Sequence, residues 1–240
     1  MEYGAYLDDA FTYTKEGILC NMNRWFSLII ALICLGIPLN GYVMRVYRGT
    51  TPAPDVDRWG TLFVDGLKLI IVGLIYAIPM MIVWAIIYGG MLLAVIQGTM
   101  DAAAMESWQP NLGLLILMYA VEIVIGIFLP VASIRFARTG SFAEAFNFGA
   151  IFGTIGKIGW IAYLIALIIV MLVDAIPIII LVLAFVVAGV GVALLLGGGD
   201  LAILGVVAVM ILVMLIISPL FTIFQARYLT RVYDSAGPVE

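Results

Sequence analysis

The segment PVASIRFAR (residues 130–138) ends a long apolar run with a proline followed by a pair of arginines. The same ending occurs in PLNGYVMRVYR (38–48) and in PLFTIFQARYLTR (219–231). The three endings hold six of the 11 basic residues of the chain, namely Arg45, Arg48, Arg135, Arg138, Arg227 and Arg231. Because arginines gather where a membrane-buried segment meets water, these endings predict one aqueous face of a membrane protein.

The composition fits a membrane protein and no water-soluble domain. Hydrophobic residues make up 65% of the 240 residues and charged residues 11%, and the mean hydropathy is +1.22. A soluble core cannot bury that much apolar surface. We therefore expect an all-α polytopic integral membrane helix bundle that forms a single transmembrane domain over residues 1–240.

The residues that the chain lacks restrict its chemistry. It has no histidine and two cysteines, Cys20 and Cys34, which excludes histidine-based triads, Cys/His zinc sites and histidine haem ligation. The net charge of −4 excludes an electrostatic nucleic-acid footprint. We predict no catalytic residue, no metal and no cofactor, and we expect that the protein is not an enzyme.

The charges between the apolar stretches sort by side of the membrane. The apolar stretches cover about residues 25–44, 69–96, 112–134, 158–196 and 201–226. Nine basic residues lie in the connecting segments 45–68, 135–157 and 227–240, which we assign to one side. The connecting segments 97–111 and 197–200, on the other side, hold no basic residue. The positive-inside rule then predicts four full crossings of the plasma membrane and a cytoplasmic C-terminus. The first apolar stretch is short, so it forms either a re-entrant segment or a fifth membrane segment.

The fourth apolar stretch is too long for one straight crossing. As a single helix it would measure about 58 Å, about twice the hydrocarbon core. It must therefore break or lie partly along the membrane interface. We expect a break at Asp174-Ala175-Ile176-Pro177, because proline removes a backbone donor and Asp174 can cap the helix that restarts there.

Each of the first two arginine-rich loops contains a short amphipathic stretch. Aromatic and aliphatic side chains share one face in each: Trp59, Phe63 and Leu67 in the first loop, Phe142 and Phe146 in the second. Asp57 is placed to cap the first stretch, and residues 141–144 have capping-box spacing in the second. We expect both to form helices, which either lie on the inner leaflet or pack on the bundle.

An internal repeat links the two halves of the chain. LIIVGLIYAIP (69–79) and LIIVMLVDAIP (167–177) are identical at eight of 11 positions, with a proline in register. An acid-Ala-Phe-polar-aromatic element also occurs twice, at 9–13 and 144–148, which favours the same side of the membrane for both copies. The approximate repeats are residues 6–97 and 141–200. Chance similarity in an apolar chain is the alternative.

Two acidic residues are predicted inside the membrane. Glu122 lies near the middle of the third apolar stretch, where a charged residue costs about 2.5 to 3.5 kcal/mol to insert. Its spacing to Gly126, Pro130 and Ser133 predicts that it faces the bundle interior. Glu122 then has two interpretations. It is a site for a proton or cation, or it is protonated and forms a hydrogen bond between two helices. Asp174 either caps a helix or is a second ligand, beside Glu122, for a proton or cation.

The arginine pairs have two interpretations. As topology determinants they anchor the helix ends at the inner surface. As a binding surface, Arg45, Arg48, Arg135, Arg138, Arg227 and Arg231 would contact anionic lipid headgroups at about 1 kcal/mol per basic residue.

Several motifs resemble a family of mainly archaeal membrane proteins, domain of unknown function 4013. The resemblance is carried by Gly36-Ile37-Pro38, Gly41 to Arg45, Trp59-Gly60-Thr61-Leu62-Phe63-Val64-Asp65-Gly66-Leu67-Lys68, Ile78-Pro79 and, more weakly, Phe142 to Phe146. It extends over nearly the whole chain. The family implies a membrane location and brings no known activity, ligand or catalytic residue.

Two functions from different classes are compatible with these features. The first is a non-enzymatic membrane-organising protein that interacts with membrane lipids, with protein partners or with further copies of itself. The second is a small transporter or channel component in which Glu122 is the intramembrane proton or cation site. A membrane enzyme would need paired carboxylates at one interface, which the sequence does not offer.

Overall fold

Four long helices dominate the structure, a computed structural model that describes residues 1–196 and 200–237. They are α4 (Trp59–Ile96), α6 (Leu112–Thr139), α8 (Trp160–Leu196) and α9 (Asp200–Asp234). Each is long and apolar enough to cross a membrane. Helices satisfy every backbone hydrogen bond within the segment, which the hydrocarbon layer requires. The predicted all-α polytopic bundle with four crossings is thus confirmed.

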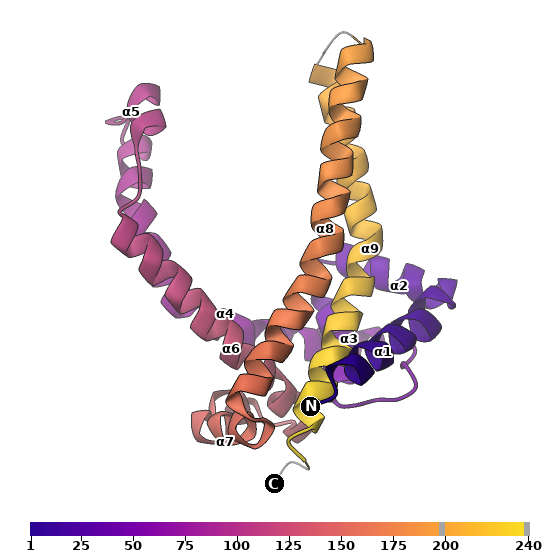
Figure 1. Cartoon of the computed structure of the whole chain (residues 1–240). Helices are drawn as coiled ribbons and strands as arrows, with labels where there is room; N and C mark the ends of the chain where they lie inside the picture. Colours follow the sequence, from indigo (N-terminus) through magenta and orange to yellow (C-terminus); the bar gives the residue numbers. More distant parts are fainter. Residues whose placement is uncertain (197–199, 238–240) are drawn as a thin grey trace.

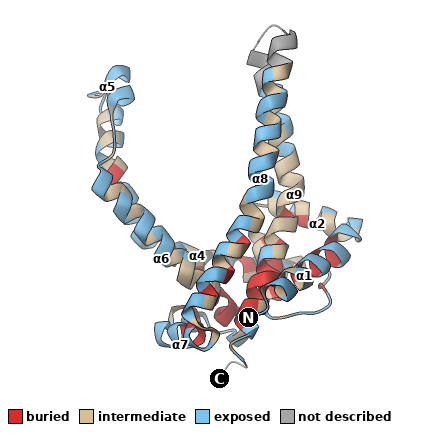
Figure 2. Ribbon diagram, in the orientation of Figure 1, coloured by how far each residue is buried: buried red, intermediate tan, exposed pale blue. Residues whose placement is uncertain are grey.

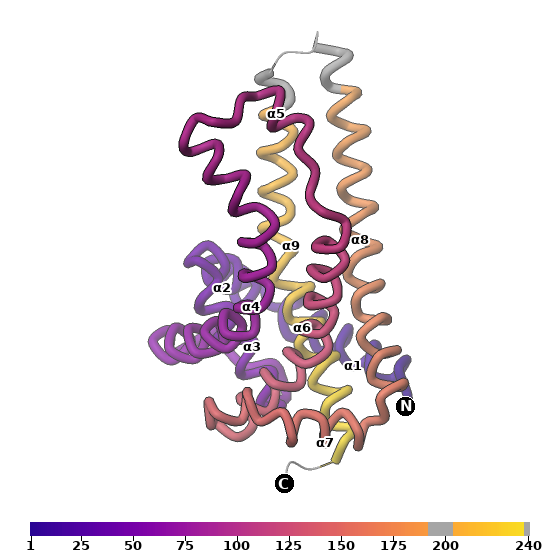
Figure 3. The backbone as a smooth tube through the Cα atoms, turned by 90° about the vertical axis from the view of Figure 1, so that its left-hand side faces the viewer, coloured from indigo at the N-terminus to yellow at the C-terminus, as the bar shows by residue number. Residues whose placement is uncertain are grey.

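The long helices form two hairpins that share one end of the molecule. α4 packs against α6, and α8 packs against α9. The two hairpins diverge from this end, as Figure 1 shows, and stand along a common direction in the side view of Figure 3. The short helix α5 (Ala102–Ser107) lies at the far tip of the first hairpin. Buried residues gather where the hairpins meet, whereas the hairpins themselves are largely exposed (Figure 2).

Short helices surround the shared end, which we call the base. They are α1 (Tyr3–Thr14), η1 (Lys15–Leu19), α2 (Met22–Ile33), α3 (Ile37–Tyr47), η2 (Phe142–Phe146) and α7 (Phe148–Ile158). The base also contains the ends of α6 and α9 that carry the arginine pairs.

The first apolar stretch is divided into two helices that do not cross a membrane. α2 has 12 residues and α3 has 11, so each is only about 16 to 18 Å long against a hydrocarbon core of about 30 Å. Between them Leu35 and Gly36 have positive φ angles of 58° and 68°, which turn the chain sharply. Of the two alternatives for this stretch, the structure therefore favours the re-entrant segment.

Helices α3 and α4 cross at very short range through two glycines. A Cβ on Gly41 would overlap the carbonyl oxygen of Leu62, and a Cβ on Gly66 would overlap that of Ile37. The absence of a side chain at both positions lets the backbones touch. This crossing places the start of the first hairpin on the base.

The predicted break at Asp174-Ala175-Ile176-Pro177 is wrong. α8 is one helix with Pro177 inside it, and α4 likewise continues through Pro79. Proline removes only one backbone hydrogen bond, whereas a break in lipid would leave several groups without partners. Asp174 is consequently an interior residue of α8 and caps no helix.

The amphipathic stretches also differ from expectation. Trp59 is the first residue of α4, and Arg58 rather than Asp57 is its N-cap. In the second loop, Ser141 makes no capping hydrogen bond, and the chain forms a 3-10 turn before α7, whose N-cap is Asn147. The shared face is confirmed in the second stretch, where the rings of Phe142 and Phe146 lie 5.4 Å apart.

Candidate functional site

The three proline-arginine endings converge on the base, and in each the first arginine is buried. Arg45, Arg135 and Arg227 are 9%, 7% and 5% exposed. Each pairs with one carboxylate: Arg45 with Asp57 at 2.7 Å, Arg227 with Asp9 at 2.6 Å, and Arg135 with Glu144. A buried guanidinium needs such a partner because its desolvation is costly.

The second arginine of each pair joins neighbouring helices. Arg48 binds Asp65 of α4 at 2.7 Å, and Arg138 binds Asp234 of α9 at 2.6 Å. Arg138 also donates to the carbonyl oxygen of Tyr47 in α3 at 2.7 Å. Arg231 lies 3.6 Å from Asp9 of α1. These bonds tie α1, α3, α4, α6 and α9 together at one end.

Burial divides the six arginines as candidates for contact with lipid headgroups. The buried Arg45, Arg135 and Arg227 direct their guanidinium groups to protein carboxylates. The side chains of Arg48 and Arg231 are 39% and 42% exposed, so they remain accessible to a headgroup. Headgroup contact stays a prediction for all six.

The acid-Ala-Phe elements supply two of the partner carboxylates. Asp9 and Glu144 occupy the same place in the two copies, and each accepts a hydrogen bond from the first arginine of a pair. The following alanines, Ala10 and Ala145, are completely buried. Both elements lie at the base, and the side of the membrane that they share stays a prediction.

Lowering the pH is expected to reduce the stability of the fold at the shared end of the two hairpins. The Arg135 guanidinium, which donates a hydrogen bond to Glu144, holds the pKa of that carboxyl below its ordinary value of 4.5. A carboxyl with a lowered folded-state pKa stabilises the fold above its unfolded pKa, and this contribution is lost as pH falls through the folded value. The melting temperature in detergent should therefore drop below about pH 4.5. Glu144→Gln should lower it at pH 7 and flatten that acid-side drop; an unchanged drop would contradict the assignment.

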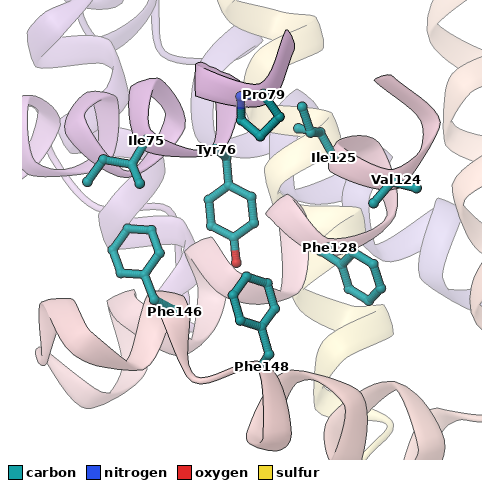
Figure 4. A pocket seen from close by; sticks show the side chains of 8 residues that line it. All are labelled: Ile75, Tyr76, Pro79, Val124, Ile125, Phe128, Phe146 and Phe148. Atoms are coloured by element: carbon teal, nitrogen blue, oxygen red, sulfur yellow. The ribbon is translucent and has the colours of Figure 1, made fainter. Parts of the chain in front are cut away.

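An apolar pocket lies beside the second acid-Ala-Phe element. It has a volume of about 280 Å³ and is lined by Ile75, Tyr76, Pro79, Val124, Ile125, Phe128, Phe146 and Phe148. In Figure 4 the ring of Tyr76 points from α4 towards Phe146 and Phe148. The Tyr76 hydroxyl donates to the carbonyl oxygen of Ala145 at 2.7 Å, and its ring stacks on Phe146 at 5.6 Å. Sequence reasoning missed this role of Tyr76, although the repeat alignment placed it opposite Asp174.

A second cavity lies at the junction where the hairpins separate. It measures about 360 Å³ and is formed by α3, α4, α6 and α9. Uncharged polar side chains line it among apolar neighbours, including Asn40, Ser133, Thr222 and Gln225. Ser133 and Gln225 each lie two residues before a buried arginine of the base. The junction cavity therefore combines hydrogen-bonding groups at the base with apolar helices that extend away from it.

Glu122 lies on the face of α6 that also carries Pro130 and Ser133, which line the junction cavity, but no bundle encloses it. Its side chain is exposed, and α6 packs on α4 in a hairpin that diverges from the hairpin of α8 and α9 (Figure 1). Asp174 is half-buried on α8, and its Oδ1 makes no hydrogen bond within the described residues. The two acids lie on different hairpins and form no common site.

A metal site has no basis in the described part of the chain, where no group of three or more histidine, cysteine or acidic side chains is placed to hold an ion. The arrangement offers instead ion-paired arginines, apolar pockets and one cavity with neutral polar groups. These features suit the binding of amphiphilic or apolar molecules.

Comparison with known proteins gives one family match. Residues 25–187, which include α3, α4, α6 and α7, match the family described as Protein of unknown function (DUF4013). Neither the search of curated proteins nor that of solved structures finds a match. Because the match covers more than half of the 240 residues, the chain belongs to the DUF4013 family of proteins of unknown function.

Proposed function

We propose that the protein is a non-enzymatic membrane-organising protein that holds membrane lipid between its two hairpins. The observation that carries this proposal is the divergence of two apolar hairpins from an ion-paired base (Figures 1 and 2). A transmembrane surface that the chain leaves uncovered is covered by lipid or by another protein.

The surface left uncovered is extensive. In the most apolar 18-residue window of α6 no residue is buried, and in the corresponding window of α9 only 11% are. Helices that belong to a closed bundle bury one face against their neighbours. The exposed surface of α6 consists mainly of apolar side chains such as Ile116, Leu117 and Ile123, with the charged Glu122 among them, and hydrocarbon chains fit against its apolar part.

The junction cavity supplies the polar end that a lipid needs. Asn40, Ser133, Thr222 and Gln225 provide donors and acceptors at the level of the base. A lipid lying between the hairpins would place its headgroup region there and its chains along α6 and α8. In this arrangement the base and the C-terminus lie on the cytoplasmic side of the plasma membrane, as the charge distribution predicts.

Filling the junction cavity should displace bound lipid. Gly73 lines the cavity and has open space where a Cβ would be, so Gly73→Leu projects a side chain into it without a clash. If this excludes about two methylene groups of a lipid, retention falls by about tenfold. The measurement is lipid retained by the purified protein in native mass spectrometry.

The matched control is Gly60→Leu, at an exposed position on the same helix that also has open space and does not line the cavity. Equal lipid retention by Gly73→Leu, Gly60→Leu and the wild type would overturn the proposal. Dimerisation through the opening would instead appear as a change of oligomeric state in Gly73→Leu, and would replace lipid by a second copy as the occupant.

The transport alternative is tested through Glu122. In liposomes we expect the same proton and cation flux from the wild type and from Glu122→Gln, because Glu122 is exposed on a hairpin of α4 and α6 and no polar cavity includes it among those described. A flux that the substitution abolishes would favour the transporter or channel hypothesis.

A further inference from the structure

A second apolar pocket lies beside the other hairpin, between α1, η1, α8 and α9. Its volume is about 420 Å³, and its walls include Phe11, Leu19, Pro177, Ile217, Phe221 and Phe224. It uses a different face of α9 from the junction cavity, since 217, 220, 221 and 224 lie on one side of that helix and 222, 225 and 229 on another. The two sites are therefore separate.

When the two repeats are aligned, residues that line this pocket match residues that line the pocket of Figure 4. Val173 and Pro177 of α8 stand where Ile75 and Pro79 of α4 stand, and Phe11 stands where Phe146 does. In the first pocket the Tyr76 hydroxyl is already bonded to Ala145. On α8 the residue aligned with Tyr76 is Asp174, which does not line the second pocket, so no such ring closes it.

A buried hydroxyl in the second pocket has no partner. Thr14 lines the pocket and is 6% exposed, and its Oγ1 makes no hydrogen bond within the described residues. A helical threonine commonly bonds to the carbonyl four residues earlier, but Thr14 does not. An unpaired buried hydroxyl is costly, so a polar group that reached it from the pocket would gain a hydrogen bond that the protein does not supply.

A free cation stands next to this hydroxyl. Lys15 lines the same pocket, is exposed, and makes no ion pair in the part of the chain that the structure describes. The arginines of the base differ, because each has a carboxylate beside it. The pocket of Figure 4 has no charged residue in its lining. The combination of apolar walls, a hydroxyl and an unneutralised ammonium group is specific to the second pocket.

We propose that this pocket binds one hydrocarbon chain of an anionic membrane lipid. The chain lies against Pro177 and the phenylalanines, an oxygen of the lipid bonds to the Thr14 hydroxyl, and the anionic headgroup pairs with the Lys15 ammonium group. The charge of Lys15 selects an anionic over a neutral headgroup. The proposal shares with the proposed function only the assumption that the protein binds lipid, and it concerns a different site.

The test compares two lipids with identical oleoyl chains, phosphatidylglycerol and phosphatidylcholine, in native mass spectrometry of the purified protein. The wild type should retain phosphatidylglycerol about tenfold better, a ratio that one charge-assisted contact can produce. Lys15→Gln should remove this preference. Lys68→Gln, at another exposed lysine without an ion pair among the described residues, is the control and should keep it.

Two further substitutions test the pocket itself. Val173→Phe should fill it and reduce retention of phosphatidylglycerol, whereas Ile75→Phe, the aligned change in the pocket of Figure 4, should not. Thr14→Val should reduce retention and raise the melting temperature of the lipid-free protein, because it removes an unpartnered buried hydroxyl. That second readout keeps the test valid if Val173→Phe fails to fold.

A preference for phosphatidylglycerol that Lys15→Gln leaves intact would overturn the proposal, as would full retention by Thr14→Val. Neither result would affect the junction site, which is judged separately by Gly73→Leu. Conversely, Gly73→Leu could lose lipid while Lys15→Gln has no effect. That result would support the proposed function and reject the proposed lipid site at Thr14 and Lys15.

Discussion

Arg227→Ala is expected to lower the free energy of unfolding by about 3 kcal/mol, because it removes one partner of a buried ion pair. The Arg227 guanidinium donates to both carboxylate oxygens of Asp9, at 2.6 and 3.2 Å, and to Thr51 at 2.9 Å. It also lies 4.6 Å from the ring centre of Tyr13. Its loss therefore detaches α1 from α9, and the melting temperature in detergent measures the effect.

Arg58→Ala is the matched control for this prediction. The Arg58 side chain is 75% exposed and lies 3.4 Å from Asp57, and exposed pairs contribute less than about 1 kcal/mol. A double substitution of Arg227 and Asp9 should be less damaging than the sum of the two single changes, because no uncompensated partner remains. If Arg227→Ala melts like Arg58→Ala, the ion-paired base does not hold the helices together.

Gly66→Ala is expected to cost at least about 3 kcal/mol, since overpacking at a rigid contact forces the backbones apart. The new methyl group would overlap the carbonyl oxygen of Ile37 and approach the amide nitrogen of Gly41. Neither backbone atom can rotate away. The α3–α4 crossing would open, and with it the ion pair between Arg48 and Asp65. A melting curve and the yield of folded protein measure the loss.

Gly73→Ala provides the internal reference on the same helix. Gly73 has open space at the Cβ position, so alanine there should leave stability unchanged or raise it by up to about 1 kcal/mol through helix propensity. Equal stability of Gly66→Ala and Gly73→Ala would show that α3 and α4 do not approach as closely as described.

The glycine crossing explains much of the family signature in physical terms. Gly41 and Gly66 allow the close approach, and Thr61 accepts a hydrogen bond from Arg45 at 3.2 Å. Asp65, in the same motif, pairs with Arg48. The motif that carried the resemblance thus builds a structural joint between α3 and α4.

The number of membrane crossings was predictable because it depends on features that can be read along the sequence. Lengths of apolar runs and the positions of arginines determine how many times a chain can cross a membrane. The first stretch was ambiguous for the same reason, since its length alone allows either a short crossing or a turn. The positive φ angles of Leu35 and Gly36, which make the turn, have no direct counterpart in a hydropathy pattern.

The partners of the arginines and the environment of Glu122 were not predictable, because both depend on tertiary arrangement. Asp9 and Arg227 lie 218 residues apart in sequence, and no local pattern connects them. The burial expected for Glu122 assumed one closed bundle, whereas Glu122 is exposed and the two hairpins diverge from the base (Figure 1). The continuity of α8 through Pro177 shows a similar limit: a proline signal is local, but the cost of breaking a helix in lipid is set by the surroundings.

The separation of the two hairpins in a bilayer tests the account most directly. After replacement of Cys20 and Cys34 by serine, spin labels are placed in nanodisc-embedded protein at exposed positions of α4, α6 and α8: Leu92, Leu117 and Val187. Divergent hairpins predict that the distance between Leu117 and Val187 exceeds that between Leu92 and Leu117 by at least about 10 Å, one helix diameter. Equal distances would mean that the hairpins close into one bundle, which would contradict an opening that holds lipid.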